Sequence, residues 1–456
     1  MKKLIAMLLA LVMVLGLAAC ATKTETPAAT ETPAASETPA AETEKTEAPA
    51  ETEEPVAEGT GRVYYLNFKP EFDEALQQLA LDYTAKTGVE VKVVTAASGT
   101  YAEVKTAEMA KTDAPTIFNL TNVSDLADWD EYAMDLTGTA IANEQNTDTF
   151  NLYNDNGELK GLGHCYETYG IIVNKDLLAA AGHSIDEITD FASLKAVADD
   201  IHARADELGF DAFSAPGLDG SSSWRFSGHL TNLPLHYQGI NAPVATITDE
   251  YLDNFKMIWD LYITDTAAEL TSLSTSTGDE SKAEFTEGKA AFYQNGTWEY
   301  ASLIEAGMTD DQLQMIPIYC GVDGEENAAL CSGTENHWAI NANASEEDIQ
   351  ASIDFLVWLV TDADASATFV DQLGSVPFKN CPASSNKFVN DGNELLSQGK
   401  YAISWAFNYT PNTDPWRATV VTALTAYSAD PTDANWEQVV AAIVDGWAYE
   451  YEVVNG

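Results

Sequence analysis

Apolar and polar positions alternate along residues 62–456 in two ways, one typical of strands and one of helices. Short apolar runs at 62–68, 89–94 and 115–120 predict strands. Apolar residues spaced by three and four predict helices at 70–87, 101–111, 175–181, 193–208, 250–263, 346–359 and 434–450. Helices that alternate with short strands over most of a chain indicate two α/β lobes.

The first of these segments predicts a complete supersecondary unit. A strand at 62–68, a helix opened by Pro70 and a strand at 89–94 form a parallel crossover, which is right-handed in nearly all proteins. Gly88 stands where a helix usually ends with a left-handed residue. We therefore expect the first lobe to start with a parallel strand–helix–strand unit.

The N-terminus has the pattern of an export signal. Lys2 and Lys3 precede an apolar run at 4–15, and small residues lead to Cys20. We interpret residues 1–19 as a signal peptide and 17–20, Leu-Ala-Ala-Cys, as similar to a bacterial lipobox that would lipidate Cys20. Ala, Thr, Glu and Pro dominate the next forty residues, so 20–61 is expected to be a lipidated, disordered tether on the extracytoplasmic side of the cell membrane.

The charge balance excludes several partners. The chain has 22 Lys and Arg against 72 Asp and Glu, a formal net charge of −50. Nucleic acids and anionic membrane surfaces would be repelled by such a protein. The hydrophobic content of 45% is nevertheless ample for a folded core. We expect a soluble receptor domain, monomeric and held to the bilayer only through the acyl chains on Cys20.

The cysteines and histidines indicate no metal site or cofactor. Cys165, Cys320, Cys331 and Cys381 follow Cys20, without the Cys-x-x-Cys spacing of structural zinc sites. Cys320 and Cys331 flank a turn signal and could form a disulfide across a hairpin, or could simply pack in the core. The sequence leaves both possibilities open.

Four segments, in order, carry a resemblance to a known family. They are 169–182, beginning Tyr-Gly-Ile-Ile-Val-Asn-Lys-Asp; 285–298, Phe-Thr-Glu-Gly-Lys-Ala-Ala-Phe-Tyr-Gln-Asn-Gly-Thr-Trp; 337–360, beginning His-Trp-Ala-Ile-Asn; and 374–377, Gly-Ser-Val-Pro. Together they resemble the extracellular solute-binding proteins of carbohydrate ABC transporters, a group that includes maltose-binding protein. The second segment is the most specific of the four.

The resemblance implies a two-lobed periplasmic-binding-protein fold of type II, with a cleft between hinged lobes. Residues 62–166 and 335–375 would form the first lobe, and 167–334 and 376–456 the second. The chain would cross between the lobes near 165–167, 332–336 and 374–378. A protein of this kind uses no cofactor and is not an enzyme; its partners are a sugar or oligosaccharide and the transmembrane subunits of an ABC permease.

Candidate ligand-binding residues come from this resemblance and from sugar chemistry. The resemblance nominates Asn67, Asn122, Glu167 and Trp416, although Glu167 could equally be an ordinary strand carboxylate. Trp298 offers a flat apolar face for a sugar ring, Asn295 offers amide donors, and the Asn-Gly pair beside Trp298 predicts a turn whose glycine lets backbone approach the ligand.

Two other tryptophans differ in the residues that surround them. Trp224 is a candidate because it lies in a polar, loop-like run, whereas Trp338 lies in a strand-like run typical of a core residue. The first-lobe loops depart from the maltose binder, with Phe68-Lys69-Pro70 in place of a Gly-Asp pair and Asn119 in place of a stacking tryptophan, which leaves the identity of the sugar open.

Two other functions remain as alternatives. The same scaffold could bind an anion such as glycerol phosphate, because Arg225 and Arg417 each adjoin a tryptophan. A secreted glycoside hydrolase would need two carboxylates at a defined separation, which a chain so rich in acids cannot exclude. No nucleophile elbow, P-loop, His-Glu-x-x-His or EF-hand pattern occurs.

Overall fold

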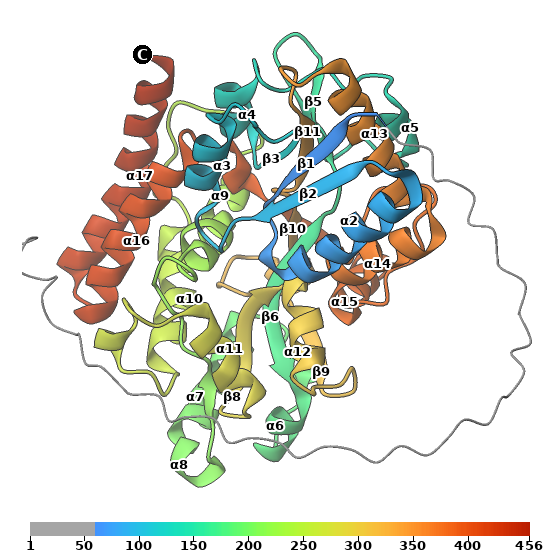
Figure 1. Ribbon diagram of the computed structural model, residues 1–456. Helices are drawn as coiled ribbons and strands as arrows, with labels where there is room; N and C mark the ends of the chain where they lie inside the picture. The colour runs from blue at the N-terminus through green and yellow to red at the C-terminus, as the bar shows by residue number, and fades with distance from the viewer. Residues whose placement is uncertain (1–59) are drawn as a thin grey trace, which may run out of the picture. The chain divides into compact units, whose positions relative to one another are not determined.

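Two mixed β-sheets organise residues 60–456, the part of the chain described by the computed structural model (Figure 1). The first sheet has the strand order β2-β1-β3-β11-β5-β4, and the second has the order β12-β10-β6-β8-β7, with β9 paired to β6. Each sheet and its helices form one lobe, and the predicted two-lobed α/β architecture is confirmed. The predicted signal peptide, Cys20 and the tether up to residue 59 lie outside the described residues.

The first lobe contains the parallel crossover expected at its start. Its elements are β1 (Arg62–Asn67), η1 (Pro70–Phe72), α2 (Asp73–Thr87), β2 (Glu90–Thr95), α3 (Tyr101–Met109), β3 (Ile117–Leu120), α4 (Val123–Trp129), α5 (Ala140–Glu144), β4 (Leu152–Tyr153), β5 (Leu159–Gly163), β11 (His337–Ile340), α13 (Glu346–Thr361) and α14 (Ala363–Leu373). Strand β1 pairs in parallel with β2 and β3. Gly88 ends α2 with a φ of 76°, as its position predicted.

The second lobe is larger and mostly helical. Its elements are β6 (Glu167–Asn174), α6 (Lys175–Ala180), η2 (Ile185–Glu187), α7 (Phe191–Ala203), α8 (Ala205–Leu208), β7 (Asp211–Phe213), the π-helical turn η3 (Arg225–Leu230), α9 (Asn232–Tyr237), α10 (Leu252–Thr264), η4 (Leu270–Ser272), α11 (Gly278–Thr286), β8 (Ala290–Gly296), η5 (Thr297–Glu299), α12 (Tyr300–Glu305), β9 (Leu313–Ile316), η6 (Glu325–Asn327), β10 (Ala328–Gly333), α15 (Lys387–Ser397), β12 (Tyr401–Ser404), η7 (Ala406–Tyr409), α16 (Thr413–Ala429) and α17 (Asp433–Asn455).

Two local predictions need correction. The helix expected at 193–208 is two helices, α7 and α8, because the chain leaves helical geometry at Arg204. The Asn-Gly pair before Trp298 is not a turn, since Asn295 and Gly296 are the last residues of β8 and pair with β6. The segment resembles a turn in composition, but its neighbours in the sheet decide its conformation.

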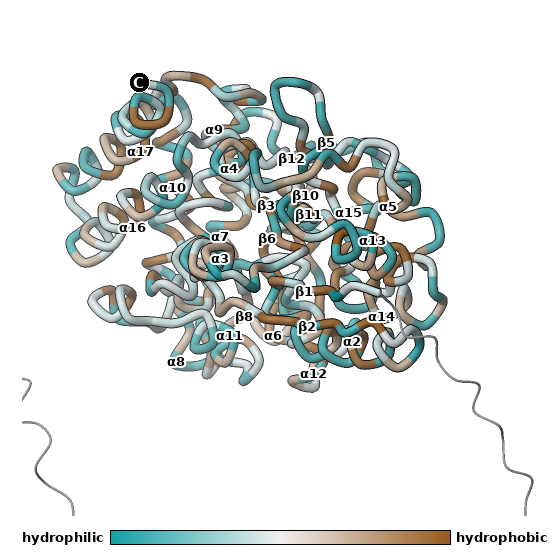
Figure 2. Tube along the Cα trace, turned by 45° about the horizontal axis from the view of Figure 1, so that its top comes forward, coloured by the Kyte–Doolittle hydropathy of each residue, from teal (hydrophilic) through white to brown (hydrophobic). Residues whose placement is uncertain are grey.

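Each lobe has its own apolar core. Trp338 lies in the first core, as expected, stacked on Phe369 and donating its indole N–H to the Tyr65 hydroxyl (2.6 Å). The second core includes Trp259 and Trp416, each fully buried. Burial of a large apolar side chain contributes roughly 1.5–3 kcal/mol. Figure 2 shows hydrophobic stretches along the edge strand β2 and its neighbour β1, with hydrophilic stretches in the outer loops.

Three crossing segments lie side by side where the lobes join. The Thr334 hydroxyl donates to the Cys165 carbonyl (2.6 Å), and the Tyr166 amide donates to the Ser375 carbonyl (2.9 Å). After Ser375 the chain still contacts the first lobe, where the Lys379 amide donates to the Glu144 carbonyl (3.0 Å). Residues 375–379 thus contact both a crossing segment and the first lobe.

The four described cysteines are free thiols, and Cys165, Cys320 and Cys331 are buried. Cys320 and Cys331 both belong to the second-lobe core, so the packing alternative describes them and a hairpin disulfide does not. Within residues 60–456 no helix combines the length and the apolar character needed to cross a bilayer.

Candidate functional site

A cleft of about 670 Å³ lies between the two lobes. The first lobe lines it with the loops that follow β1, β2 and β3 and with α3 and α4, and the second lobe with the loop after β7, η3, η5 and the start of α16. Parallel strands place their carboxyl ends at one sheet edge, which is where α/β sheets bind ligands. The strand order of the first sheet thus positions the first-lobe loops as one wall.

The wall from the second lobe is a cluster of aromatic rings. Trp298 lies 5.6 Å from Trp224 and 5.4 Å from His229, measured between ring centroids. Tyr169 of β6 supports both Trp298 and His229 from the sheet, at 6.2 and 5.0 Å and nearly parallel. A Cβ on Gly296 would lie 2.2 Å from the Trp298 ring. Gly296 therefore accommodates this indole, and does not open the backbone to a ligand as the sequence suggested.

Two polar atoms of this aromatic wall are buried and unpaired. Trp298 Nε1 and His229 Nδ1 have no hydrogen-bond partner among the described residues, and both residues line the cleft. His229 is only 2% exposed, and burial, aided by Arg417, holds the pKa of its imidazole well below the usual range. A neutral imidazole and an indole N–H can each bond a hydroxyl group of a ligand.

The wall from the first lobe combines rings with charges. Phe68 packs edge-on against Tyr101 at 5.2 Å, and Trp129 lies nearby on α4. The Lys105 ammonium lies between them, 5.5 Å from the Tyr101 ring and 5.1 Å from the Trp129 ring, and 2.5 Å from Asp125. Burial lowers the pKa of Lys105, an effect that Asp125 opposes.

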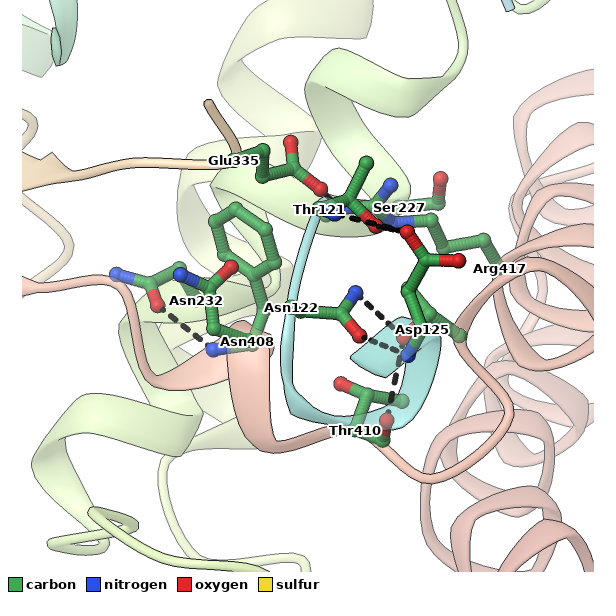
Figure 3. Close-up of polar contacts among 12 residues, drawn as sticks. Thr121, Asn122, Asp125, Ser227, Asn232, Glu335, Asn408, Thr410 and Arg417 are labelled. Atoms are coloured by element: carbon green, nitrogen blue, oxygen red, sulfur yellow. Dashed lines mark hydrogen bonds and ion pairs between the residues drawn. The ribbon is translucent and has the colours of Figure 1, made fainter. Parts of the chain in front are cut away.

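Every cation that lines the cleft is paired with a carboxylate. Lys69 contacts Glu167 (2.6 Å) and Glu71 (2.7 Å), Lys105 contacts Asp125, and Arg417 contacts Glu335 (3.0 Å; Figure 3). Three other carboxylates of the cleft, those of Glu103, Asp128 and Asp414, have no ion-pair partner within residues 60–456. The cleft therefore offers an anion no unpaired positive charge.

The pKa values of these groups follow from their burial. Burial opposes the charge on Lys69, but Glu167 and Glu71 outweigh that effect and keep its pKa well above the usual range. Burial raises the pKa of the Glu335 carboxyl, although Arg417 opposes the shift. Burial and the nearby Asp125 raise the pKa of Asp128.

Besides the Lys69–Glu167 ion pair, two sets of hydrogen bonds join the lobes across the cleft. In the first set, Asn122 Nδ2 donates to Thr413 Oγ1 (3.1 Å) and the Asn412 amide donates to Ser124 Oγ (3.1 Å). Asn412 has a φ of 45°, a left-handed conformation that a non-glycine residue adopts at some cost. In the second set, the Ser98 hydroxyl donates to the Ser221 carbonyl (3.4 Å).

Four of the seven predicted ligand-binding residues line the cleft: Asn122, Glu167, Trp224 and Trp298. Asn122 and Glu167 are already engaged by the protein. Asn122 Oδ1 caps α4 by accepting from the Ser124 and Asp125 amides, both at 3.0 Å. Glu167 Oε1 pairs with Lys69, and its Oε2 accepts from Asn336 Nδ2 at 2.8 Å. Trp224 donates its indole N–H to the Ser221 carbonyl (2.8 Å) and leaves its ring to the cleft.

The structure places the other three outside the cleft lining. Asn67 bonds the backbone of Lys69 and shapes the loop after β1. Asn295 donates to the Tyr293 hydroxyl (2.6 Å) and is 2% exposed. Trp416 is fully buried because its face of α16 packs against α17, where its indole N–H donates to the Ile443 carbonyl (3.0 Å). Contacts within the protein hold each of these three side chains in place.

Sequence reasoning missed several residues of the cleft. Trp129 ends an amphipathic helix and Lys105 is a cation inside one, so neither has a local signal that distinguishes it from an ordinary surface residue. His229 belongs to the irregular turn η3, and such π-helical turns often mark functional sites. Arg225, a candidate for anion binding, is 1% exposed and donates to the Gln294 carbonyl (2.9 Å), away from the cleft.

No set of three or more His, Cys, Asp or Glu side chains within residues 60–456 is grouped as a metal site requires. The chemistry that the cleft residues support is binding through ring faces and hydrogen bonds, in a space within the usual range of ligand pockets.

The sequence profile of the bacterial extracellular solute-binding proteins matches residues 78–394. The chain belongs to this family. The sequence-based prediction of the family is thereby confirmed. No curated protein sequence matches this chain.

Solved structures share the fold of this solute-binding protein. The solute-binding protein RafE, solved in complex with raffinose, has a TM-score of 0.67 and is 15% identical to this chain. The match covers 85% of this chain and 100% of the RafE chain. The apo form of RafE from Streptococcus pneumoniae also matches. A chitin oligosaccharide binding protein has a TM-score of 0.65 at 18% identity, covering 86% of this chain and 99% of its own. The GacH receptor of Streptomyces glaucescens, solved unliganded and with acarbose, has a TM-score of 0.63 at 18% identity with the same coverage.

Proposed function

We propose that this solute-binding protein captures an uncharged sugar or oligosaccharide by closing its lobes, and delivers it to the transmembrane subunits of an ABC permease. The observation that carries the proposal is the composition of the cleft. Aromatic rings line both walls, and each cation there is neutralised by a carboxylate of the protein. Sugar rings present C–H groups on their faces and hydroxyls at their edges, which suits such a cleft.

The proposed ligand contacts follow from which groups are free. Trp298 and Trp224 offer ring faces, and the carboxylates of Asp128 and Asp414, which have no ion-pair partner among residues 60–456, can accept from hydroxyls. Asn122 and Glu167 would contact ligand only by exchanging their present partners. A ligand that touches both walls would favour the closed state over the open one.

Isothermal titration calorimetry tests the proposal directly. We expect at least one neutral saccharide among raffinose, chitin oligosaccharides, xylo-oligosaccharides and maltotriose to bind, and glycerol 3-phosphate not to bind. Binding of glycerol 3-phosphate alone would contradict the proposal and favour the anion alternative. The paired state of Arg417 and the distance of Arg225 from the cleft both argue against that outcome.

We also propose that the protein binds its sugar without transforming it. The family consists of binding proteins, and affinity in the proposed site comes from stacking and hydrogen bonds alone. Incubation of the protein with each bound saccharide, followed by chromatography of the products, should return the saccharide intact. Cleavage that persists after purification to homogeneity, and disappears when the cleft carboxylates Asp128 and Asp414 are replaced by Asn, would establish a glycoside hydrolase instead.

The N-terminal pattern supports a proposal about location. We infer that the chain is exported, that Cys20 is lipidated, and that the monomeric receptor is tethered to the outer face of the cell membrane. Metabolic labelling with a radioactive fatty acid should mark the parent chain and not Cys20→Ser. A parent chain that stays unlabelled and is recovered in the medium would contradict the anchor while leaving the ligand proposal intact.

A further inference from the structure

Two glycine-containing loops meet at the mouth of the cleft. The first, 97–100, joins β2 to α3 in the first lobe, and the second, 218–223, lies between β7 and η3 in the second lobe. Gly99 and Gly220 are exposed, yet a Cβ on Gly99 would lie 2.4 Å from the Gly220 carbonyl oxygen. No side chain fits between the two backbones there. We call this approach, together with the Ser98–Ser221 hydrogen bond, the rim contact.

The rim contact depends on how the lobes are placed. Neither loop contains a crossing segment, so a rotation of one lobe about the three crossing segments changes the distance between Gly99 and Gly220. Gly99 also has a φ of 75°, which favours glycine whatever its surroundings. Two independent properties, backbone conformation and close approach, thus require glycine at this position.

The rim contact is joined to a ring of the aromatic wall. The Ser221 carbonyl accepts from the Trp224 indole N–H at 2.8 Å as well as from the Ser98 hydroxyl. Asp219 holds the same loop in shape, since its Oδ1 accepts from the Ser221 amide (3.0 Å) and the Ser221 hydroxyl (2.7 Å). A single carbonyl therefore links the first lobe to the orientation of Trp224.

We propose that Gly99 and the loop around Gly220 and Ser221 are positioning residues for ligand capture: their contact holds the closed lobes together and keeps Trp224 facing the solute. This goes beyond the proposed function, on which it rests only for the identity of the solute. Because variants of one interface differ mostly in their dissociation rates, loss of the contact should raise the dissociation rate more than it lowers the association rate.

Matched glycine variants test the proposal. Gly157, in the turn between β4 and β5, has a φ of 78° and no atom within 4 Å of the position of a Cβ. Gly99→Ala and Gly157→Ala therefore share the backbone strain, but only Gly99→Ala meets the Gly220 carbonyl. We expect Gly99→Ala to raise the dissociation constant for a saccharide bound by the parent on the order of tenfold, mainly through the dissociation rate in stopped-flow fluorescence. Gly157→Ala should match the parent.

A second pair of variants, with Asn in place of Ala, controls for misfolding. Asn tolerates left-handed backbone better than Ala does, so Gly99→Asn and Gly157→Asn keep the comparison if Gly99→Ala is unstable. Equal unfolding temperatures for the two Asn variants, with weaker binding only for Gly99→Asn, would support the rim contact. Equal binding by the two variants would overturn it.

An interlobe distance gives a readout that needs no ligand. Spin labels at Ala110→Cys, directly after α3, and at Asp279→Cys on α11, both exposed, report on the two lobes in a full chain with Cys20 and Cys381 replaced by Ser. We expect the Gly99 variants to lose the shortest distances seen in the parent and the Gly157 variants to retain them. Unchanged distances in the Gly99 variants would overturn the rim contact. If no saccharide in the panel binds the parent, the proposed function fails while this measurement still decides the inference.

Discussion

The two walls of the cleft differ in how they hold their shape. The second-lobe wall is a packed group of rings in which Trp298, Trp224 and His229 contact one another and rest on Tyr169. The first-lobe wall is built from loops after strands and depends on a buried ion pair, Lys105 with Asp125. The difference indicates that one wall is a preformed stacking surface whose rings support one another, whereas the other is fixed by electrostatics.

The largest effect is expected where the first-lobe wall depends on charge. Asp125→Asn leaves the Lys105 ammonium, 2% exposed, without its counter-charge. Breaking a buried pair costs about 3–5 kcal/mol. We expect the free energy of unfolding to fall by an amount near the lower end of this range, because burial lowers the pKa of Lys105 and allows the ammonium to lose its proton. Urea unfolding followed by circular dichroism measures the loss.

The ion pair between Arg417 and Glu335 and a double variant test this comparison further. Arg417 and Glu335 are 16% and 12% exposed, so Arg417→Met should cost less than Asp125→Asn. Lys105→Met combined with Asp125→Asn should recover most of the lost stability. Lys195→Met, which breaks an exposed pair on α7, should change the free energy of unfolding by less than about 0.5 kcal/mol. Equal losses for all three single variants would remove the distinction between the walls.

Stacking of a bound saccharide should depend more on the rings of the second-lobe wall than on those of the first-lobe wall. Trp298→Ala removes the ring at the centre of the aromatic cluster, and loss of such a buried face costs roughly 2 kcal/mol, or about thirtyfold in affinity. Trp129→Ala should weaken binding less, because that ring packs mainly against Phe118 and Tyr132 in its own lobe. Calorimetry with a saccharide bound by the parent measures both.

Tyr153→Ala, an exposed ring on β4, serves as the matched control and should bind as the parent does. A greater loss for Trp129→Ala than for Trp298→Ala would reverse the assignment of the stacking surface.

The fold was predictable from the sequence because its signals are local. The apolar spacing of α10, α13 and α17 and the glycine after α2 were visible in short windows, and the structure has these elements within a few residues of the predicted ends. The break between α7 and α8 was not visible, because the apolar pattern continues through it.

The cleft was less predictable because each residue's role depends on what covers it. Trp298 and Trp416 are the same residue type in similarly polar surroundings, but α17 covers Trp416 and nothing in the described structure covers Trp298 in that way. Asn295 adjoins the cleft in sequence, yet strand alternation turns its side chain toward Tyr293. These outcomes depend on tertiary contacts that a sequence window does not contain.

The buried imidazole of His229 in the second-lobe wall should make the stability of the protein depend on pH. The pKa of His229 is depressed, so its contribution to stability is present above pH 6.5 and is lost as the pH falls below that value. His229→Phe keeps a ring in the wall and removes the titration. Its stability relative to the parent should rise by about 1–2 kcal/mol between pH 7 and pH 5, as measured by urea unfolding at each pH.

A half-buried histidine gives the opposite sign. Partial burial lowers the pKa of His183, but its hydrogen bonds to the carboxylates of Glu187 and Asp200 outweigh that effect and raise the pKa. Its contribution is present below pH 6.5 and is lost as the pH rises, so His183→Gln should lose stability relative to the parent as the pH falls. If the difference in unfolding free energy between His229→Phe and the parent stays constant between pH 7 and pH 5, the imidazole of His229 titrates normally.

The smallest effect is expected at the hydrogen bond that joins the walls near the crossing segments. Thr413→Val removes the oxygen that accepts from Asn122, but the Asn412–Ser124 bond remains and Asn122 still caps α4. One hydrogen bond contributes about 0.5–1.5 kcal/mol, so saccharide affinity in calorimetry should fall about two- to twelvefold. Thr419→Val, exposed on the same helix, should change nothing. A Thr413→Val loss as large as that of Trp298→Ala would mean that hydrogen bonding between the lobes, and not stacking on one wall, governs capture.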